Sequence, residues 1–212
     1  MDDLKKWQNR CIAHDMVETL KLKQFDAHYA EDLESAKKMV LDMIPENASI
    51  GLGGSVTLRE MGFPEIFRQE PYRLIDRYSQ PSWEAELQAY RDAQHSDFFV
   101  CGTNAITGAG ELVNIDSSGN RVSAMIFGPQ RVIVVAGVNK VVDSLEDAMK
   151  RLKKIAPLNC RRLGHKTPCA ETGKCEDCSI PARMCNYTAI IHHGMKFEGR
   201  ISIVLIADEI GF

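Results

Sequence analysis

The stretch SIGLGGSVTLREMGF (Ser49–Phe63) decides the class of the fold, because it reads as a strand, a glycine turn and a short helix in succession. Glycines in such a turn let the backbone approach a ligand closely, and the following helix directs free N–H groups towards an anion. Gly51 and Gly53 fit the start of a dinucleotide-binding fingerprint, but Val56 occupies its third glycine position. No Gly-Lys-Ser/Thr follows, which excludes a P-loop. The pattern predicts an anion-binding turn or, equally well, a tight turn that binds nothing.

Apolar strands and amphipathic helices alternate on both sides of this turn. Helices are expected up to about Lys23 and over residues 32–44, 82–96 and 144–156, and buried strands at residues 97–102, 131–137 and 201–208. Residues 111–128 read as a β-hairpin around a Ser-Ser-Gly-Asn turn. This alternation predicts an α/β fold with a mostly parallel sheet flanked by helices, built as one domain over residues 1–212.

The composition is that of an ordinary globular protein. Hydrophobic residues make up 44% and charged residues 26% of the 212 positions, and the net charge is −3. No basic run indicates a nucleic acid or an acidic membrane as partner. The first residues lack the apolar core of a signal peptide, and the apolar run Ile201–Ala207 is far shorter than the roughly 20 residues of a membrane span. We therefore expect a cytoplasmic protein.

Residues 157–199 interrupt the α/β pattern and are rich in cysteine. Four cysteines follow the spacing C-x5-C-x2-C-x6-C: Cys169, Cys175, Cys178 and Cys185. In a C-x2-C pair, two thiolates from one turn can reach the same metal ion. The cytoplasm keeps thiols reduced, which favours metal or redox chemistry over structural disulfides. We predict an irregular Cys-rich segment before the last strand, with these four cysteines as ligands of zinc or an iron–sulfur cluster.

Two alternatives remain for these cysteines. They could form disulfides or a thiol switch, or they could pack as unmetallated thiols, since free cysteine is commonly buried. The spacing does not distinguish zinc from an iron–sulfur cluster, because it matches neither a zinc finger nor a common ferredoxin run. Cys160, just upstream, is expected to be a spare ligand or a packing residue.

Small and polar side chains gather after three of the predicted strands, where α/β sheets bind their ligands. The predicted ligand-binding residues are Gly53, Gly54, Ser55, Thr103, Asn104, Thr107, Gly108, Asn114, Asn139 and Lys140. The pocket is expected where the first three of them approach Asn104, Thr107 and Gly108. The alternatives are turns that satisfy their own backbones and, at position 140, a solvated lysine.

The segments GLGGSVTLREMG, GTNAITGAGELVNIDSSGNRV, RVIVVAGVNKVV and the C-terminal DEIGF together resemble the LUD family of lactate-utilisation proteins over nearly the whole chain. The resemblance implies a fold similar to that of ribose-5-phosphate isomerases and CoA-transferases. It also implies a role in oxidising lactate to pyruvate, with a small anionic metabolite as ligand and iron–sulfur proteins as partners. We also expect that the chain can form a homo-oligomer. The Cys-rich segment resembles that of a short-chain subgroup, and the partner chemistry favours an iron–sulfur cluster over zinc.

Fold relatives implied by this resemblance use a carboxylate as base or nucleophile beside a bound phosphate or thioester. Glu111 and Asp116 flank Asn114 in the long motif, so they are the predicted catalytic pair, the alternative being two solvated caps. His192 and His193 could serve acid–base chemistry or a metal, although adjacent residues of an extended chain point to opposite faces.

Two classes of function follow from these residues. The chain is an enzyme or enzyme subunit acting on lactate, or on another substrate as an isomerase or CoA-transferase would. Otherwise it is a non-enzymatic metabolite-binding or redox-sensing module with a thiolate metal site. The sequence shows no obvious nucleophile–base constellation, which supports the second class.

Overall fold

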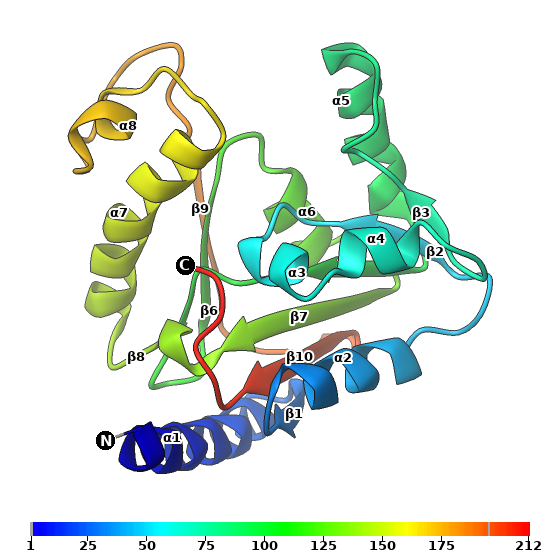
Figure 1. The fold of residues 1–212 in the computed structure, drawn as a ribbon, viewed down its shortest axis with the longest axis vertical. Coiled ribbons are helices and arrows are strands. Elements are labelled where there is room, and N and C mark those ends of the chain that lie inside the picture. The colour runs from blue at the N-terminus through cyan, green and yellow to red at the C-terminus, as the bar shows by residue number, and fades with distance from the viewer. Residues whose placement is uncertain (1, 195) are drawn as a thin grey trace.

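The computed structural model describes residues 2–194 and 196–212, and its centre is a six-stranded sheet whose neighbouring strands are all parallel (Figure 1). The strands are β1 (Asp26–Ala30), β2 (Ser49–Leu52), β3 (Arg73–Ile75), β4 (Phe98–Cys101), β7 (Arg131–Gly137) and β10 (Ile201–Ile206). Their order across the sheet is β1-β10-β7-β4-β2-β3. Because parallel strands need crossover connections, helices cover the sheet. The predicted α/β fold with a mostly parallel sheet flanked by helices is confirmed.

Alternating residues of the central strands face two separate apolar layers. Val132 and Val134 pack in the layer that includes α1 (Asp2–Leu22) and α6 (Asn120–Ile126). Ile133 and Val135 pack in the layer that includes α2 (Leu33–Asp42), α3 (Val56–Glu60) and α4 (Phe63–Phe67). Burial on both faces explains why the central strands read as continuous apolar runs in the sequence.

A smaller, four-stranded sheet accompanies the first one. Its strands are β5 (Ala105–Thr107), β6 (Leu112–Asp116), β8 (Val141–Val142) and β9 (Tyr187–Ile191), in the order β8-β5-β6-β9. Helix α7 (Leu145–Arg162) packs on this sheet, where Ala148 and Leu152 are buried with Ala105 and Val113. The other helices are α5 (Trp83–Asp92), α8 (Pro168–Thr172) and the 3-10 helices η1 (Ala93–His95) and η2 (Val138–Lys140).

The predicted hairpin at residues 111–128 is wrong in its second half, where the chain forms α6 instead of a strand. Gly119 has a left-handed φ of +80° and turns the chain out of β6. The carboxylate of Asp116 then accepts hydrogen bonds from the N–H groups of Arg121 and Val122, both at 3.1 Å. These bonds satisfy donors in the first turn that would otherwise be free, so a helix start replaces the hairpin turn.

The predicted irregular segment at residues 157–199 contains more regular structure than expected. Helix α7 continues past Pro157 to Arg162, and residues 187–191 form β9. Although proline removes one helical hydrogen bond, Leu152, Ala156 and Cys160 continue the buried face of α7 in steps of four residues. Burial of that face outweighs the local effect of the proline.

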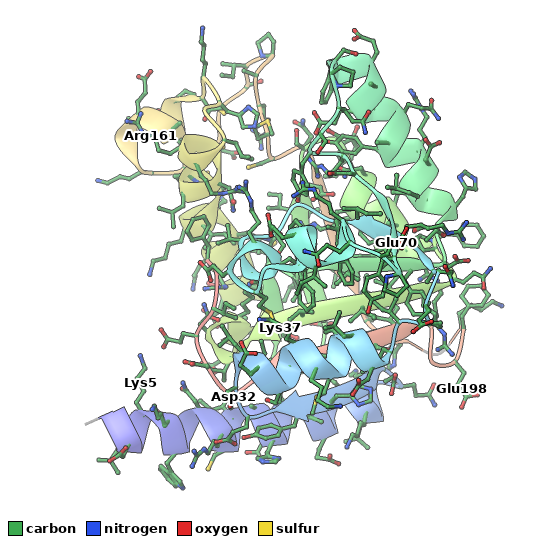
Figure 2. The ribbon with its side chains drawn as sticks, turned by 45° about the vertical axis from the view of Figure 1, so that its right-hand side comes forward. Lys5, Asp32, Lys37, Glu70, Arg161 and Glu198 are labelled. Atoms are coloured by element: carbon green, nitrogen blue, oxygen red, sulfur yellow. The ribbon has the colours of Figure 1, made fainter. Side chains whose placement is uncertain are left out.

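Charged side chains such as Glu70, Arg161 and Glu198 cover the outside of the molecule (Figure 2). In the part of the chain that the structure describes, none of the helices has the length and apolar character of a membrane span. Since the strands of the larger sheet are parallel, the carboxyl ends of β2, β4 and β7 share one edge. The loops that leave this edge form the candidate site.

Candidate functional site

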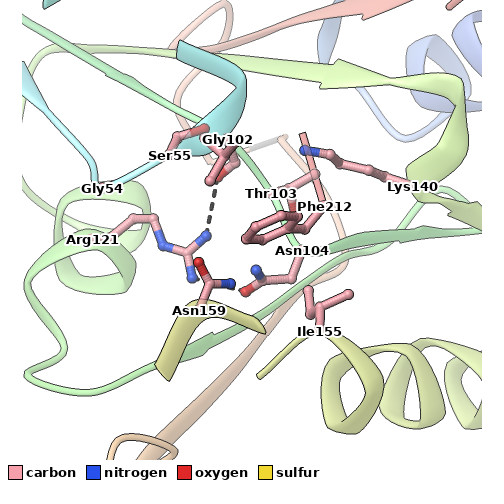
Figure 3. A pocket seen from close by; sticks show the side chains of 11 residues that line it. Gly54, Ser55, Gly102, Thr103, Asn104, Arg121, Lys140, Ile155, Asn159 and Phe212 are labelled. Atoms are coloured by element: carbon pink, nitrogen blue, oxygen red, sulfur yellow. Dashed lines mark hydrogen bonds between the residues drawn. The ribbon is translucent and has the colours of Figure 1, made fainter. Parts of the chain in front are cut away.

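A pocket opens where the loops that follow β2 and β4 meet α7 (Figure 3). Its volume is about 350 Å³ when the space open to solvent at its mouth is included, and it is lined by Gly54, Ser55, Val56, Gly102, Thr103, Asn104, Arg121, Lys140, Ile155, Asn159 and Phe212. The lining side chains include two cations and no Asp or Glu. A pocket with this lining is suited to an anion.

Lys140 brings a buried positive charge to the pocket. It lies on η2 directly after β7, and only 4% of its surface is exposed. Its Nζ donates a hydrogen bond to Thr57 Oγ1 at 2.7 Å, and no carboxylate among the described residues forms a salt bridge with it. Burial lowers the pKa of Lys140 to about 8, and the positive charges of Arg151 and Arg121 act in the same direction. The side chain extends into the pocket beside the ring of Phe212 (Figure 3).

Arg121 holds together the loops around the pocket. Its Nε and Nη2 donate to Asp116 Oδ1 at 3.0 and 2.8 Å, and its Nη1 donates to Gly102 O and Asn114 Oδ1 at 3.2 and 2.9 Å. Nη2 also donates to Asn104 Oδ1 and Ile115 O. All five N–H groups of this guanidinium therefore have protein acceptors. Arg121 shapes the pocket but has no free donor for a ligand.

Arg151 of α7 adds a third positive charge close to Lys140. Its Nε donates to Asn104 O at 2.9 Å, whereas its buried Nη2 has no hydrogen-bond partner among the described residues. Burial lowers the pKa of Arg151. Of these three cations, only Arg121 forms a salt bridge within the described residues, with Asp116. The carboxylate of Glu60 opposes the lowering of the pKa of Lys140 by burial but forms no salt bridge with it, so positive charge is still in excess around the pocket.

Five of the predicted ligand residues line the pocket: Gly54, Ser55, Thr103, Asn104 and Lys140. Gly53 packs directly behind them, where a Cβ would lie 2.7 Å from the Cβ of Cys101. Ser55 Oγ accepts a hydrogen bond from the N–H of Leu58 at 3.4 Å and thereby caps α3. The turn after β2 and the loop after β4 do meet, and the binding roles of these residues stay a prediction.

The other predicted ligand residues lie outside the pocket lining and have structural partners. Gly108 donates its N–H to Asp143 O at 3.3 Å. Asn114 Oδ1 accepts from Arg121 and from the N–H of Asn104. Asn139 binds the C-terminal segment: its Nδ2 donates to Gly211 O at 3.3 Å, and its Oδ1 accepts from the N–H of Ile210 at 3.4 Å. Thr107 is fully buried and donates to Glu111 Oε2 at 3.0 Å.

The structure divides the predicted catalytic pair between two places. Both carboxylate oxygens of Asp116 accept hydrogen bonds, from the Arg121 guanidinium and from backbone N–H groups at the start of α6. Glu111 lies at the β5–β6 turn, where its Oε1 is 2.7 Å from Nδ1 of the exposed His192. Neither carboxylate lines the pocket. The sequence did not reveal the Glu111–His192 pair because 81 residues separate its members, and a catalytic role for Glu111 and Asp116 stays a prediction.

Five cysteines form a thiol cluster, defined as Cys160, Cys169, Cys175, Cys178 and Cys185, beside the end of α7. Cys160 and Cys169 are buried and pack with Ala170 and the side chain of Met184. Burial raises the pKa of Cys185 to about 11, and the neighbouring thiols at positions 160, 175 and 169 raise it further. Burial likewise raises the pKa of Cys160, with Cys169 and Cys178 acting in the same direction. Cys160 is thus a full member of the cluster.

The thiol cluster has the donors of a metal site but not its geometry. Thiolates suit zinc and iron–sulfur clusters. Within residues 2–194 and 196–212, however, no three His, Cys, Asp or Glu side chains are arranged to hold a metal ion, and the seven cysteines are free thiols. The sulfur atoms would have to move closer together to bind one metal ion or cluster, so the metal site stays a prediction.

Comparison with known proteins identifies the family. A family model described as the LUD domain matches residues 13–206, which is nearly the whole chain. The chain belongs to the LUD domain family. This family is associated with lactate utilisation, and the resemblance carried by the sequence motifs is confirmed. Among curated proteins, no match to this LUD domain protein is found.

One solved structure resembles this LUD domain protein in fold, and a second gives a weaker match. A DUF162 family protein from Deinococcus radiodurans is 10% identical, aligns over 93% of this chain and 98% of its own, and gives a TM-score of 0.51. A ribose 5 phosphate isomerase A from Neisseria gonorrhoeae is 16% identical, aligns over 58% of this chain and 63% of its own, and gives a TM-score of 0.33. At 10% identity the similarity to the DUF162 family protein concerns the fold alone.

Proposed function

We propose that this LUD domain protein binds a small carboxylate of the lactate and pyruvate class, and that the ammonium group of Lys140 holds the carboxylate. One observation carries the proposal. The buried Nζ of Lys140 has a single hydrogen-bond partner among the described residues, the neutral hydroxyl of Thr57. The protein would then serve as a subunit or accessory protein in the oxidation of lactate to pyruvate.

The energetics of Lys140 support an anionic ligand. Burying an ammonium group without a counter-ion costs several kcal/mol, and a carboxylate bound beside it would offset part of this cost. An ammonium group has three N–H donors, and the hydroxyl of Thr57 uses one of them. The buried Nη2 of Arg151 is a further donor without an acceptor in the described chain. The side chains of Asn104 and Asn159 also line the pocket, and their amide groups could bind a hydroxyl or keto oxygen.

The pocket supports binding and orientation more than proton abstraction, because none of the side chains that line it is Asp, Glu or His. Oxidation of lactate to pyruvate removes two electrons and two protons, so the reaction needs an electron acceptor. We assign this role to partner proteins that carry iron–sulfur clusters.

Calorimetric titration with L-lactate and with pyruvate tests the carboxylate site. We expect Lys140→Met to weaken binding by at least about tenfold, because a charged hydrogen bond is worth roughly 1.5–3 kcal/mol. Lys150→Met is the matched control, since Lys150 is a solvent-exposed lysine on α7, and it should bind as the wild type does. Equal affinities of the wild type and Lys140→Met would rule out the Lys140 site.

Deletion of the gene tests the role in lactate oxidation. A strain without the protein and without a redundant copy should grow poorly on lactate as the carbon source and normally on pyruvate. Normal growth on lactate would contradict the role in lactate oxidation. It would not bear on carboxylate binding, which the calorimetric titration tests separately.

A second candidate function is a redox-sensing module, and the gathering of five thiols favours it. We propose that the thiol cluster takes up zinc or an iron–sulfur cluster when its sulfurs draw together. Anaerobic purification, metal analysis and a visible spectrum test this idea. Cys175→Ser with Cys178→Ser should abolish metal binding, whereas Cys11→Ser, an exposed cysteine of α1, should keep it. Metal-free wild-type protein would leave disulfides or packed thiols as the explanation.

A further inference from the structure

Three arginines from separate parts of the chain meet beside the pocket, around the ring of Tyr78. Arg59 comes from α3, Arg77 from the segment after β3, and Arg162 from the end of α7. The guanidinium carbons of Arg59 and Arg77 lie 5.9 and 5.1 Å from the centre of the Tyr78 ring. Arg162 lies close enough to Tyr78 to interact with it electrostatically, and the positive charges of Arg59 and Arg77 act on its guanidinium. We call Arg59, Arg77 and Arg162 the rim cluster.

The rim cluster adjoins the pocket on two sides. Arg77 Nη1 lies 3.3 Å from the place that a Cβ on Gly54 would occupy. Arg162 Nη2 donates to Asn159 Oδ1 at 3.1 Å. Gly54 and Asn159 both line the pocket. A ligand that fills the pocket can therefore extend onto the rim cluster without leaving the protein surface.

The positive charges of the rim cluster are poorly neutralised. Arg77 forms a salt bridge with Glu86 at 3.1 Å, but neither Arg59 nor Arg162 has a carboxylate partner among the described residues. Burial lowers the pKa of Arg162, and the neighbouring Arg59 and Arg77 lower it further. Like charges held together repel one another, so an anion bound between them would be stabilised.

The geometry of guanidinium groups points to the chemical class of that anion. A guanidinium is a planar fork whose donors match the oxygens of a phosphate group, and forks that arrive from several directions can engage several oxygens at once. A single small carboxylate held by Lys140 would leave Arg59 and Arg162 of this cluster without a counter-ion. The rim cluster therefore indicates a second anionic group on the ligand.

Building on the proposed carboxylate site, we propose that the ligand is a phosphorylated carboxylic acid. Its carboxylate enters the pocket at Lys140, and its phosphate group binds the rim cluster. The ligand is then a small metabolite with two anionic ends, and unphosphorylated lactate fills only the inner half of the site. Joining the two groups in one molecule makes the second contact intramolecular, which raises affinity above that of either group alone.

Calorimetric titration at fixed ionic strength tests this proposal with three probes. L-Lactate reports on the pocket, inorganic phosphate on the rim cluster, and 3-phosphoglycerate on both. The wild type should bind 3-phosphoglycerate at least about tenfold more tightly than lactate. Arg59→Gln and Arg162→Gln should each weaken the binding of 3-phosphoglycerate about tenfold, because each removes one guanidinium that donates charged hydrogen bonds to the phosphate. The affinity for lactate should be unchanged.

Matched controls separate the rim cluster from a general loss of charge or fold. Arg161→Gln removes an exposed charge at the neighbouring position of α7 and should bind all three probes as the wild type does (Figure 2). Arg59 and Arg162 are also exposed, so their variants should keep the thermal unfolding temperature of the wild type. Lys140→Met should weaken lactate and 3-phosphoglycerate but leave inorganic phosphate unaffected.

The outcomes distinguish failure of the rim cluster from failure of the pocket. If lactate binding depends on Lys140 and 3-phosphoglycerate binds no more tightly than lactate, the phosphate proposal is wrong and the carboxylate site stands. Equal affinities of Arg59→Gln, Arg162→Gln and Arg161→Gln for 3-phosphoglycerate would also overturn it. If 3-phosphoglycerate depends on the rim arginines but not on Lys140, the carboxylate site is the part that fails.

Discussion

Lys140 keeps its positive charge at a cost in stability. In the folded protein the pKa of Lys140 is about 8, against an ordinary lysine value of 10.5. Between these values the unfolded state binds more protons, so the free energy of unfolding rises with pH across this window. Below it, the buried charge costs about 3 kcal/mol. We expect Lys140→Met to raise the free energy of unfolding at neutral pH by roughly 1–3 kcal/mol. Urea unfolding at neutral pH and again near pH 10 measures the gain, which should shrink at the higher pH.

The same titration should govern carboxylate binding. Only the protonated lysine attracts a carboxylate, so affinity for lactate should be constant well below pH 8 and fall as the pH rises above the pKa of about 8. The fall approaches about tenfold per pH unit while the free protein loses its proton. Titrations at pH 7 and pH 9.5 measure this change. An affinity that is the same at both values would mean that Lys140 does not hold the ligand.

Asp116 and Arg121 should be worth more to stability than any surface pair. Arg121 is 7% exposed and relies on Asp116 as its counter-ion. We expect Asp116→Asn to lower the free energy of unfolding by about 3–5 kcal/mol, because it leaves a buried charge uncompensated. Asp143→Asn, at an exposed carboxylate, should change it by less than about 0.5 kcal/mol. Denaturant unfolding of both variants makes the comparison.

At the scale of elements, the entry into α6 depends on one glycine. Gly119 adopts φ +80°, which costs a residue with a Cβ about 1–2 kcal/mol. Gly119→Ala should therefore lower the free energy of unfolding by that amount. The adjacent Ser118→Ala, at an exposed position, should be neutral in the same denaturant experiment. If both variants match the wild type, the left-handed turn is not the reason that a helix replaces the hairpin.

The sequence predicts elements where burial and local pattern agree. The central strands β7 and β10 are buried along most of their length, so their apolar runs were sufficient. The sequence pattern gave the wrong element where a contact outside the local stretch decides the secondary structure. The hairpin was expected from apolar alternation around residues 117–120, but the carboxylate of Asp116 caps a helix there. The helix was expected to end at residue 156, but the buried face of α7 continues to Cys160.

The residues of the pocket also fall into those that the sequence predicts and those that it does not. Gly54, Ser55 and Lys140 directly follow strands that end at one edge of the sheet, so their position was predictable from topology. Arg121 and Arg151 were not singled out, because their importance lies in hydrogen bonds to loops far away in the chain. The rim cluster joins residues 59, 77 and 162, and no local pattern connects them.

At the scale of the whole molecule, the end of α7 contributes to three candidate functional regions within four residues. Asn159 lines the pocket, Cys160 belongs to the thiol cluster, and Arg162 belongs to the rim cluster. The helix reaches this point as one continuous element that packs on the smaller sheet through Ala148 and Leu152. A displacement of its last turn would therefore be felt in all three regions.

We predict that this shared turn links ligand binding and thiol reactivity thermodynamically. A ligand that fixes Asn159 and Arg162 should stiffen the turn and slow alkylation of Cys160, while exposed Cys11 on α1 serves as an internal reference. Mass spectrometry after timed labelling, with and without 3-phosphoglycerate, measures the two rates. Equal slowing of both cysteines, or of neither, would contradict the linkage. Linkage is reciprocal, so a change in the redox state of the thiols would alter metabolite affinity by the same factor as the metabolite alters the redox equilibrium. The protein would then report the oxidation state of its surroundings through its occupancy.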